Sequence, residues 1–315
     1  MGHFYKRLGM SSSKVFYCYD GATPLTAALL SVGYTISDSD KEPMEFYELV
    51  EQQNEKYLYR NRYVLPLGYG ISESSLAQWE LEEGLPFDVN NSLAEAIGIQ
   101  EKLFEQIPVY ETGDEVIIET DERDYLYAYP IACSHKNITA ELPEGEKTFN
   151  KVYYPRMLDL GLCEKGSRIV LRGSGDIRSA GAGFDVVVYR MKPEVLKQMI
   201  QVLGNTPMHI EKMSDTYVSG KIEMPKKGML ATSVPNEEGW KVKVDGKQTE
   251  ISPFAGVMLG VELEKGNHLI EFIYTPPGLY SGAVISIASV ILFLLLHRSR
   301  IVKGAKPKQR HGKQQ

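Results

Sequence analysis

The densest group of glycines and charges lies in residues 172–183, RGSGDIRSAGAG. Glycine-rich loops bind phosphate when a helix follows them, because the helix N-terminus presents free N–H groups. Here Arg178 occupies the third glycine position of the dinucleotide fingerprint, and a strand pattern follows instead of a helix. The pattern therefore favours a loop between strands. The alternative is a ligand-binding loop in which Arg172, Asp176 and Arg178 hold a sugar or a phosphate.

Aromatic residues give two further candidates. Trp240 opens a predicted strand, where its ring either packs in a core or stacks on a sugar; core packing is the favoured interpretation. Tyr125, Tyr127 and Tyr129 share one face of another predicted strand, which again favours the core over a binding surface.

The remaining patterns point away from catalysis. Acid pairs such as Glu82-Glu83 and Asp121-Glu122 lie in polar, turn-like surroundings typical of solvated loops, not of a glycosidase pair. No Ser-His-Asp or Cys-His arrangement stands out. Three cysteines and six histidines show no metal-ligand spacing, and the cysteines are too few for a disulfide framework. The sequence thus predicts no catalytic residue, no metal and no cofactor.

Charge is distributed unevenly along the 315 residues. The net charge is −6, yet the last nineteen residues contribute +7 and contain no acid, so the preceding part carries −13. Nucleic-acid binding needs a basic face, which an acidic body does not offer. With 43% hydrophobic residues, the chain is able to bury one large core or two ordinary ones.

One segment is apolar enough to cross a membrane. Leu279 to Leu296 contains no charge, and a helix of this length measures about 27 Å, close to the thickness of the hydrocarbon core. The basic tail after it predicts a cytoplasmic C-terminus and an extracytoplasmic body. Gly278, Gly282 and Ser286 form a small-residue stripe that predicts packing against another helix, although incidental small residues are the alternative.

The N-terminus creates a topological question. It contains no apolar stretch long enough for a signal peptide, so the sequence alone does not explain how the body crosses a membrane. We favour the C-terminal piece of a larger membrane protein, whose missing multi-pass bundle is the expected partner. A tail-anchored protein with a cytoplasmic body is the alternative.

Local patterns predict an α+β protein. Helices are expected from Thr23-Pro24, from Pro43, from Ser92 (a capping box with Glu95) and from Pro193 to Gly204. Short strands dominate after residue 108, including residues 151–154, a hairpin turning at Asp245-Gly246, and a pair formed by residues 257–263 and 268–274. The predicted organisation is a small mixed α/β segment (1–107), a jelly-roll-like antiparallel β-sandwich (108–277), one transmembrane helix (278–297) and a basic cytoplasmic tail (298–315).

Several segments together resemble one known family. NRYVLPLGY (61–69) resembles the "N…LPLGY" stretch of the bacterial YfhO family of multi-pass membrane proteins, and PNEEGWKVKVDGK (235–247) is similar to its "GW…VDGK" signature. Residues 29–34, with Gly33 where the family usually has lysine, and residues 256–261, 266–272 and 274–278 add to the resemblance. Their order and their junction with a terminal membrane helix are more specific than any one motif.

The resemblance implies a function for the larger protein. YfhO-type proteins look like GT-C glycosyltransferases that use a polyprenyl-phosphate-sugar donor and glycosylate lipoteichoic acid. In that class the catalytic carboxylate lies in an early extracytoplasmic loop, so this chain would be an accessory region at the cell envelope without a catalytic residue of its own. A free-standing, membrane-anchored carbohydrate-binding module is the alternative.

Overall fold

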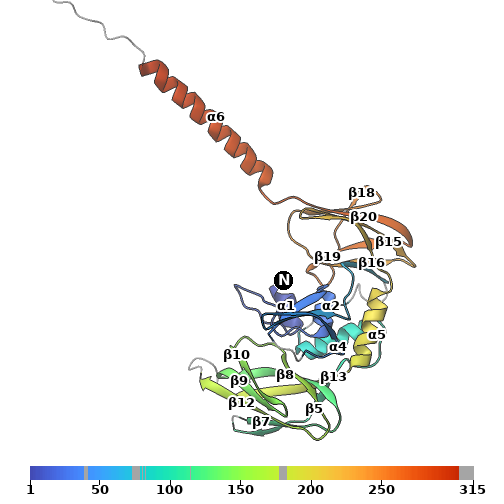
Figure 1. Ribbon diagram of the computed structural model, residues 1–315. Helices are drawn as coiled ribbons and strands as arrows, with labels where there is room; N and C mark the ends of the chain where they lie inside the picture. The colour runs from blue at the N-terminus through green and yellow to red at the C-terminus, as the bar shows by residue number, and fades with distance from the viewer. Residues whose placement is uncertain are drawn as a thin grey trace, which may run out of the picture.

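A computed structural model describes residues 1–38, 42–72, 79, 81, 83–113, 115–176 and 183–304; Asp176 and residues 299–304 are described by their backbone only. Figure 1 shows two regions of β-sheet with helices between them, and a long C-terminal helix that projects away from the body. The predicted α+β class with an antiparallel β-sandwich and one apolar C-terminal helix is confirmed, although the strands form two sandwiches where the sequence predicted one.

The first β-sandwich contains the strands of the middle of the chain: β5 (Phe104–Ile107), β6 (Tyr110–Thr112), β7 (Glu115–Glu119), β8 (Asp124–Cys133), β9 (His135–Leu142), β10 (Gly145–Asn150), β11 (Leu158–Cys163), β12 (Arg168–Asp176) and β13 (Phe184–Met191). They form two antiparallel sheets, in the orders β10-β9-β12-β7-β6 and β11-β8-β13-β5. Ile118, Ile138 and Leu171 of one sheet share a buried core with Leu126 and Val188 of the other. Each such fully buried aliphatic side chain contributes about 1.5–3 kcal/mol to folding.

The second β-sandwich precedes the C-terminal helix. Its strands are β4 (Gly68–Ser72), β14 (His209–Ser214), β15 (Tyr217–Met224), β16 (Gly228–Pro235), β17 (Trp240–Val244), β18 (Lys247–Thr249), β19 (Met258–Leu263) and β20 (Gly266–Tyr274). One sheet has the order β14-β15-β20-β17-β18 and the other β19-β16-β4. Val218, Phe272, Leu230 and Leu259 lie in the shared core. β4 and β5 both precede residue 108, so strands from the predicted N-terminal segment take part in both sandwiches; the boundary at 107 stays a prediction.

A helical layer joins the two sandwiches. It consists of α1 (Gly2–Arg7), α2 (Pro24–Leu29), α4 (Pro86–Ala96) and α5 (Pro193–Gly204), which lie between the sheets in Figure 1. One core cluster contains side chains of these helices, tyrosines of β8 and β13, and Phe254 beside the second sandwich. The prediction that Tyr125, Tyr127 and Tyr129 belong to the core is confirmed, because all three are buried there.

Two helix starts follow from their local sequence. The Thr23 hydroxyl accepts a hydrogen bond from the Thr26 amide (3.3 Å), the Thr23 amide donates to Thr26 Oγ1 (2.7 Å), and Pro24 follows at the first helical position. Pro193 occupies the same position in α5, which buries the predicted apolar face. Both starts are as predicted.

The helix predicted from Pro43 is wrong. The chain instead forms a small antiparallel sheet, β1-β3-β2, from β1 (Tyr34–Ser37), β2 (Tyr47–Gln53) and β3 (Lys56–Asn61). Asn54 and Glu55, at φ +48° and +59°, make the tight turn that returns β3 along β2. Pairing with a strand later in the sequence therefore overrides the local helical pattern.

Three other local predictions need correction. The helix expected from Ser92 begins at Pro86, and Ser92 lies within it, donating to the Val89 carbonyl (2.9 Å). Residues 151–154 form a turn that Lys151 enters with φ +56°, not a strand. β19 and β20 do not pair, because they face the same core from opposite sheets. The hairpin at Asp245-Gly246 is confirmed, with φ +52° and +77°.

The C-terminal helix α6 (Leu279–Gly304) has 26 residues and is therefore about 39 Å long. Its segment Leu279–Arg298 is long and apolar enough to span a membrane, and none of that segment is buried against the body. Only four residues separate it from β20: Thr275, Pro276, Pro277 and Gly278. The described residues end at Gly304, so the part of the predicted basic tail that follows Gly304 lies outside them.

Candidate functional site

A cleft of about 790 Å³ lies between the N-terminal segment and the connection from β10 to β11. It shares Asp20, Gly21, Ala22 and Asp159 with a neighbouring hollow of about 180 Å³. We call the two together the tyrosine cleft, because the lining of the larger includes Phe16, Phe149, Tyr153 and Tyr154, and that of the smaller includes Tyr19, Tyr47, Tyr59 and Tyr127. The larger volume is within the range of small-molecule sites.

The N-terminal wall of the cleft is held by backbone pairing and one glycine. The Ser11 amide donates to the Asp20 carbonyl (2.8 Å), and the Cys18 amide donates back to Ser11 (3.0 Å). Gly21 then turns the chain at φ +91°, where a Cβ would lie 2.6 Å from the Gly9 carbonyl oxygen. A residue with a side chain would therefore push this wall away from the body.

The opposite wall is the turn that replaces the strand predicted at residues 151–154. The Tyr153 and Tyr154 rings lie 4.6 Å apart between centroids, and Tyr154 meets Phe16 edge to face at 4.9 Å. Tyr153 is 41% exposed. Rings from both walls therefore meet here, Phe16 from the N-terminal wall and Tyr154 from the turn, and the neighbouring Tyr153 ring is open to solvent.

Four charged residues of the cleft, Asp20, Lys147, Arg156 and Asp159, are engaged by the protein. The buried Arg156 pairs with Asp20, with 2.8 Å between Nε and Oδ2, and donates from Nη2 to the Asn150 carbonyl (2.9 Å). Asp159 accepts from the Gly161 amide (2.8 Å), and Lys147 donates to its carbonyl oxygen (2.8 Å). Because both carboxylates are held in place, they suit binding of hydroxyl groups better than proton transfer to a substrate.

The tyrosines act as neutral hydroxyl groups. Burial, with a smaller contribution from Tyr5, raises the pKa of Tyr19 to about 12. Burial likewise raises the pKa of Tyr47 and Tyr127 well above the ordinary value. Near neutral pH these phenols remain protonated; Tyr19 and Tyr47 can donate hydrogen bonds to a ligand, whereas Tyr127 belongs to the buried core. Aromatic faces beside neutral donors and fixed carboxylate acceptors are chemistry that suits a carbohydrate.

The residues singled out from sequence lie elsewhere. Arg172, in β12, forms ion pairs across the sheet with Glu115 (2.6 Å) and with Glu141. Asp176 ends the same strand opposite His135, and Arg178 lies outside the described residues. Trp240 belongs to the other sandwich, so the structure does not bring it together with β12. Their role in ligand binding stays a prediction.

The small residues proposed for helix packing lie at the start of the membrane helix. Gly278 precedes α6, while Gly282 and Ser286 follow within it at four-residue spacing. Nothing in the described part of the chain packs on this stripe. Its pairing with another helix also stays a prediction.

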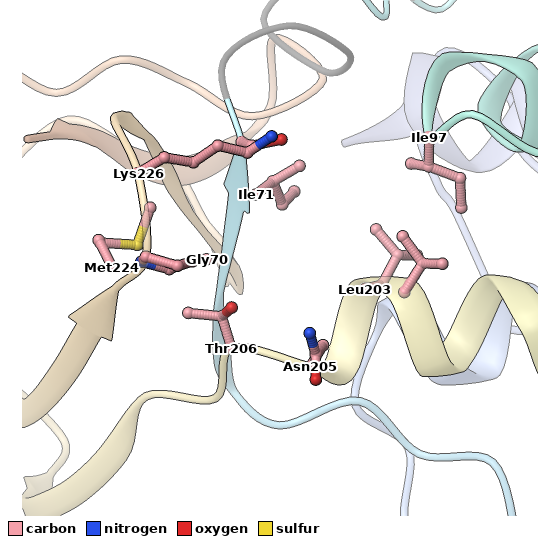
Figure 2. Close-up of a pocket in the computed structure, with 11 residues that line it drawn as sticks. Gly70, Ile71, Ile97, Leu203, Asn205, Thr206, Met224 and Lys226 are labelled. Atoms are coloured by element: carbon pink, nitrogen blue, oxygen red, sulfur yellow. The ribbon is translucent and has the colours of Figure 1, made fainter. Parts of the chain in front are cut away.

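Two other hollows have structural explanations. Figure 2 shows one of them, lined by Leu203 of α5 and by Gly70 and Ile71 of β4, with a volume of about 200 Å³. A Cβ on Gly70 would lie 2.6 Å from the Met224 sulfur, so β4 packs closely on β15 beside this hollow. The other, about 430 Å³, is rich in charge, but Arg190 pairs with Asp121 and Glu122.

Among the described residues, no three His, Cys, Asp or Glu side chains gather as a metal site requires. Within the same residues the three cysteines are free thiols. The structure therefore offers the tyrosine cleft as its best candidate binding site. Sequence reasoning missed it, although Tyr153-Tyr154 and Tyr17-Cys18-Tyr19-Asp20 were visible as short aromatic clusters.

Two antiparallel sandwiches, a helical layer and, within the described residues, one apolar helix long enough to cross a membrane define a β-sandwich protein with a candidate membrane anchor. A family model described as "Bacterial membrane protein YfhO" matches residues 1–117 and 111–286. The chain therefore belongs to the YfhO family of bacterial membrane proteins, as the resemblance predicted.

A curated relative agrees. The chain is 30% identical over 118 residues to the "Uncharacterized protein YfhO" of Bacillus subtilis (strain 168), a match that covers 37% of this chain and 14% of that protein. The match therefore covers only a small part of the length of the Bacillus subtilis protein, 14% of it.

Similar solved structures are remote. A GH2 beta-galacturonidase from Eisenbergiella tayi bound to glycerol is 12% identical with a TM-score of 0.20, covering 55% of this chain and 35% of its own. A cupin 2 conserved barrel domain protein from Leptotrichia buccalis is 13% identical with a TM-score of 0.15. This match covers 55% of this chain and 89% of the cupin chain. Such low scores bear on neither fold nor function.

Proposed function

We propose that this chain is the C-terminal extracytoplasmic body and last membrane helix of a YfhO-type protein, and that it holds an acceptor polymer beside a membrane-embedded glycosyltransferase. Family membership and the apolar helix α6 support a body attached to a membrane. The resemblance supplies the reaction: transfer from a polyprenyl-phosphate-sugar to lipoteichoic acid by a membrane bundle outside this chain. The body contributes binding and no catalytic group.

The tyrosine cleft is the observation that carries this proposal. It is open to solvent at Tyr153, and aromatic rings line both of its walls. Asp20 and Asp159 are fixed by Arg156 and Gly161, so a ligand meets acceptors that are already oriented. Preorganised acceptors reduce the entropy lost when a flexible polymer binds.

The direct test measures binding of lipoteichoic acid to the full chain in detergent micelles by isothermal titration calorimetry. Tyr153→Ala removes an exposed ring from the cleft and should weaken binding about threefold to tenfold. The matched control is Tyr110→Ala, which removes a 60% exposed tyrosine from β6, outside the cleft. Equal affinity of both variants, or no binding by the unmodified chain, would remove the cleft from the proposal.

A second candidate is a free-standing carbohydrate-binding module. It is favoured by the exposed ring of Tyr153, which offers a stacking face for a glycan without any contribution from a membrane bundle. The two candidates differ in their membrane partner. Affinity purification from gently solubilised membranes should recover a multi-pass bundle under the first candidate and the chain alone under the second.

A further inference from the structure

Two aromatic rings lie at the end of the second sandwich from which the membrane helix leaves. Trp240 of β17 and Tyr274 of β20 are direct cross-strand neighbours, and their ring centroids are 5.0 Å apart. Trp240 packs partly on the sandwich core, and both side chains remain partly exposed. Trp240 therefore covers part of the core at this end, and both rings keep one side open to the surroundings.

The junction holds these rings close to the membrane. The Thr275 amide donates to the Gly239 carbonyl (3.0 Å), and the Tyr274 amide donates to Thr216 (2.8 Å), so the sheet remains paired up to the link. Pro276 and Pro277 stiffen the link itself. Four linking residues span at most about 14 Å. Because the apolar run begins at Leu279, this end of the sandwich must lie at or beside the headgroup layer.

The chemistry at this end suits the membrane interface. Tyr280, in the first turn of α6, is 74% exposed, so a third amphipathic ring lies near the link. Trp and Tyr are enriched at headgroup depth because each ring has an apolar body and a polar tip. The neighbouring Glu237, Glu238 and Lys241 are all exposed, so this end carries mixed charge and its aromatic rings are its distinguishing chemistry.

We propose that Trp240, Tyr274 and Tyr280 form an aromatic anchor that seats the second sandwich in the headgroup and glycerol layer of the phospholipid bilayer crossed by α6. The anchor is continuous with the membrane helix and holds for either orientation of that helix. It adds a second point of attachment, so the body has a fixed face toward the lipid. This inference is independent of the tyrosine cleft and of any glycan.

The chain contains two tryptophans, which makes the anchor measurable. Trp79 is 5% exposed in the helical layer and serves as the internal control. The full chain is reconstituted in phosphatidylcholine vesicles that carry a nitroxide either on the headgroup or near the acyl-chain end. In Trp79→Phe, emission from Trp240 should fall about twofold with the shallow label and less with the deep one.

The reciprocal variant tests specificity. In Trp240→Phe, emission from Trp79 should be unaffected by either label. Trp79→Phe loses the hydrogen bond from Nε1 to Ser92 Oγ (3.1 Å), so its melting temperature is measured first. If Trp79→Phe does not fold, quenching is compared between the unmodified chain and Trp240→Phe. The difference in quenched emission between these two proteins then reports Trp240 alone.

Three results would overturn the anchor. The first is Trp240 emission that neither label reduces. The second is equal quenching of both tryptophans. The third is quenching that appears only with phosphatidylglycerol at low salt, because that would make the attachment electrostatic.

Discussion

Arg156 and Asp20 form an ion pair in the wall of the tyrosine cleft, with 2.8 Å between Nε and Oδ2, although the arginine side chain is only 7% exposed and the aspartate 56%. The pair joins the segment that precedes α2 to the connection between β10 and β11. The hydrogen bond of the guanidinium on this side runs from Nη2 to the carbonyl oxygen of Asn150 (2.9 Å). One buried cation thus holds two walls of the candidate site together.

The pair predicts an unequal response to substitution. Asp20→Asn leaves the buried guanidinium without its anionic partner and should lower the free energy of unfolding by about 1–3 kcal/mol. Arg156→Ala should cost more, because the Asn150 carbonyl then also loses its donor. Thermal unfolding of the full chain in detergent measures both changes. Arg123→Ala, which removes an exposed pair with Glu164, is the control and should cost less than about 1 kcal/mol.

His268 predicts a pH dependence of stability. Burial lowers its pKa, but hydrogen bonds to Asp245 and to the Glu264 carbonyl outweigh burial, so the pKa is raised above 6.5. A raised pKa means that the stabilisation is complete below pH 6.5 and is lost as the pH rises through the folded-state pKa. The melting temperature should therefore be higher at pH 6 than at pH 8, by an amount equivalent to about 1 kcal/mol or less.

His268→Gln is the control for that dependence. The hydrogen bonds from His268 and from the Leu269 amide lower the pKa of Asp245, so its own contribution remains complete across this pH range. The variant should therefore reduce the difference between pH 6 and pH 8. An unchanged difference would assign the effect to another group.

Gly239 predicts a local steric limit at the membrane end of the second sandwich. It has φ +110°, and a Cβ there would overlap the Thr275 carbonyl oxygen and lie 3.1 Å from the Tyr274 ring. Gly246, at φ +77°, has open space around the same position. Gly246→Ala should cost about 1–2 kcal/mol, the ordinary penalty of the left-handed region. Gly239→Ala should cost clearly more in the same thermal unfolding measurement, and equal costs would contradict the steric argument.

The basic tail predicts the orientation of α6. Seven Lys and Arg residues follow the apolar run without an acid, which favours a cytoplasmic C-terminus. A fluorescent protein that matures only in the cytoplasm, fused after Gln315, should be bright, and alkaline phosphatase fused there should be inactive. The opposite result would place the body in the cytoplasm, as in the tail-anchored alternative.

Elements with strong local signals could be predicted from sequence. Thr23-Pro24 and Pro193 start helices because the capping hydroxyl and the proline act within one turn. Asp245-Gly246 forms its hairpin for a similarly local reason. The apolar run of α6 needs no tertiary information to be recognised.

Elements that depend on distant partners could not be predicted. The segment after Pro43 has a helical pattern, but pairing with β3 makes it a strand. β19 and β20 look like a hairpin, although their partners are β16 in one sheet and β15 and β17 in the other. The tyrosine cleft combines residues near 20, 47, 127 and 153, and only the folded chain brings them together.

The position of β4 has a consequence for how the molecule can be divided. This strand pairs along β16, which lies some 160 residues later in sequence, and its other side meets Thr206 through the Gly70 amide (2.7 Å). Deletion of all residues up to Ser72 would remove β4, the strand that pairs with one edge of β16. The backbone amides and carbonyls along that edge of β16 would then lack hydrogen-bond partners. Such a bare edge recruits strands from other molecules. Deletion of residues 1–72 should therefore increase self-association of the protein through the exposed edge of β16.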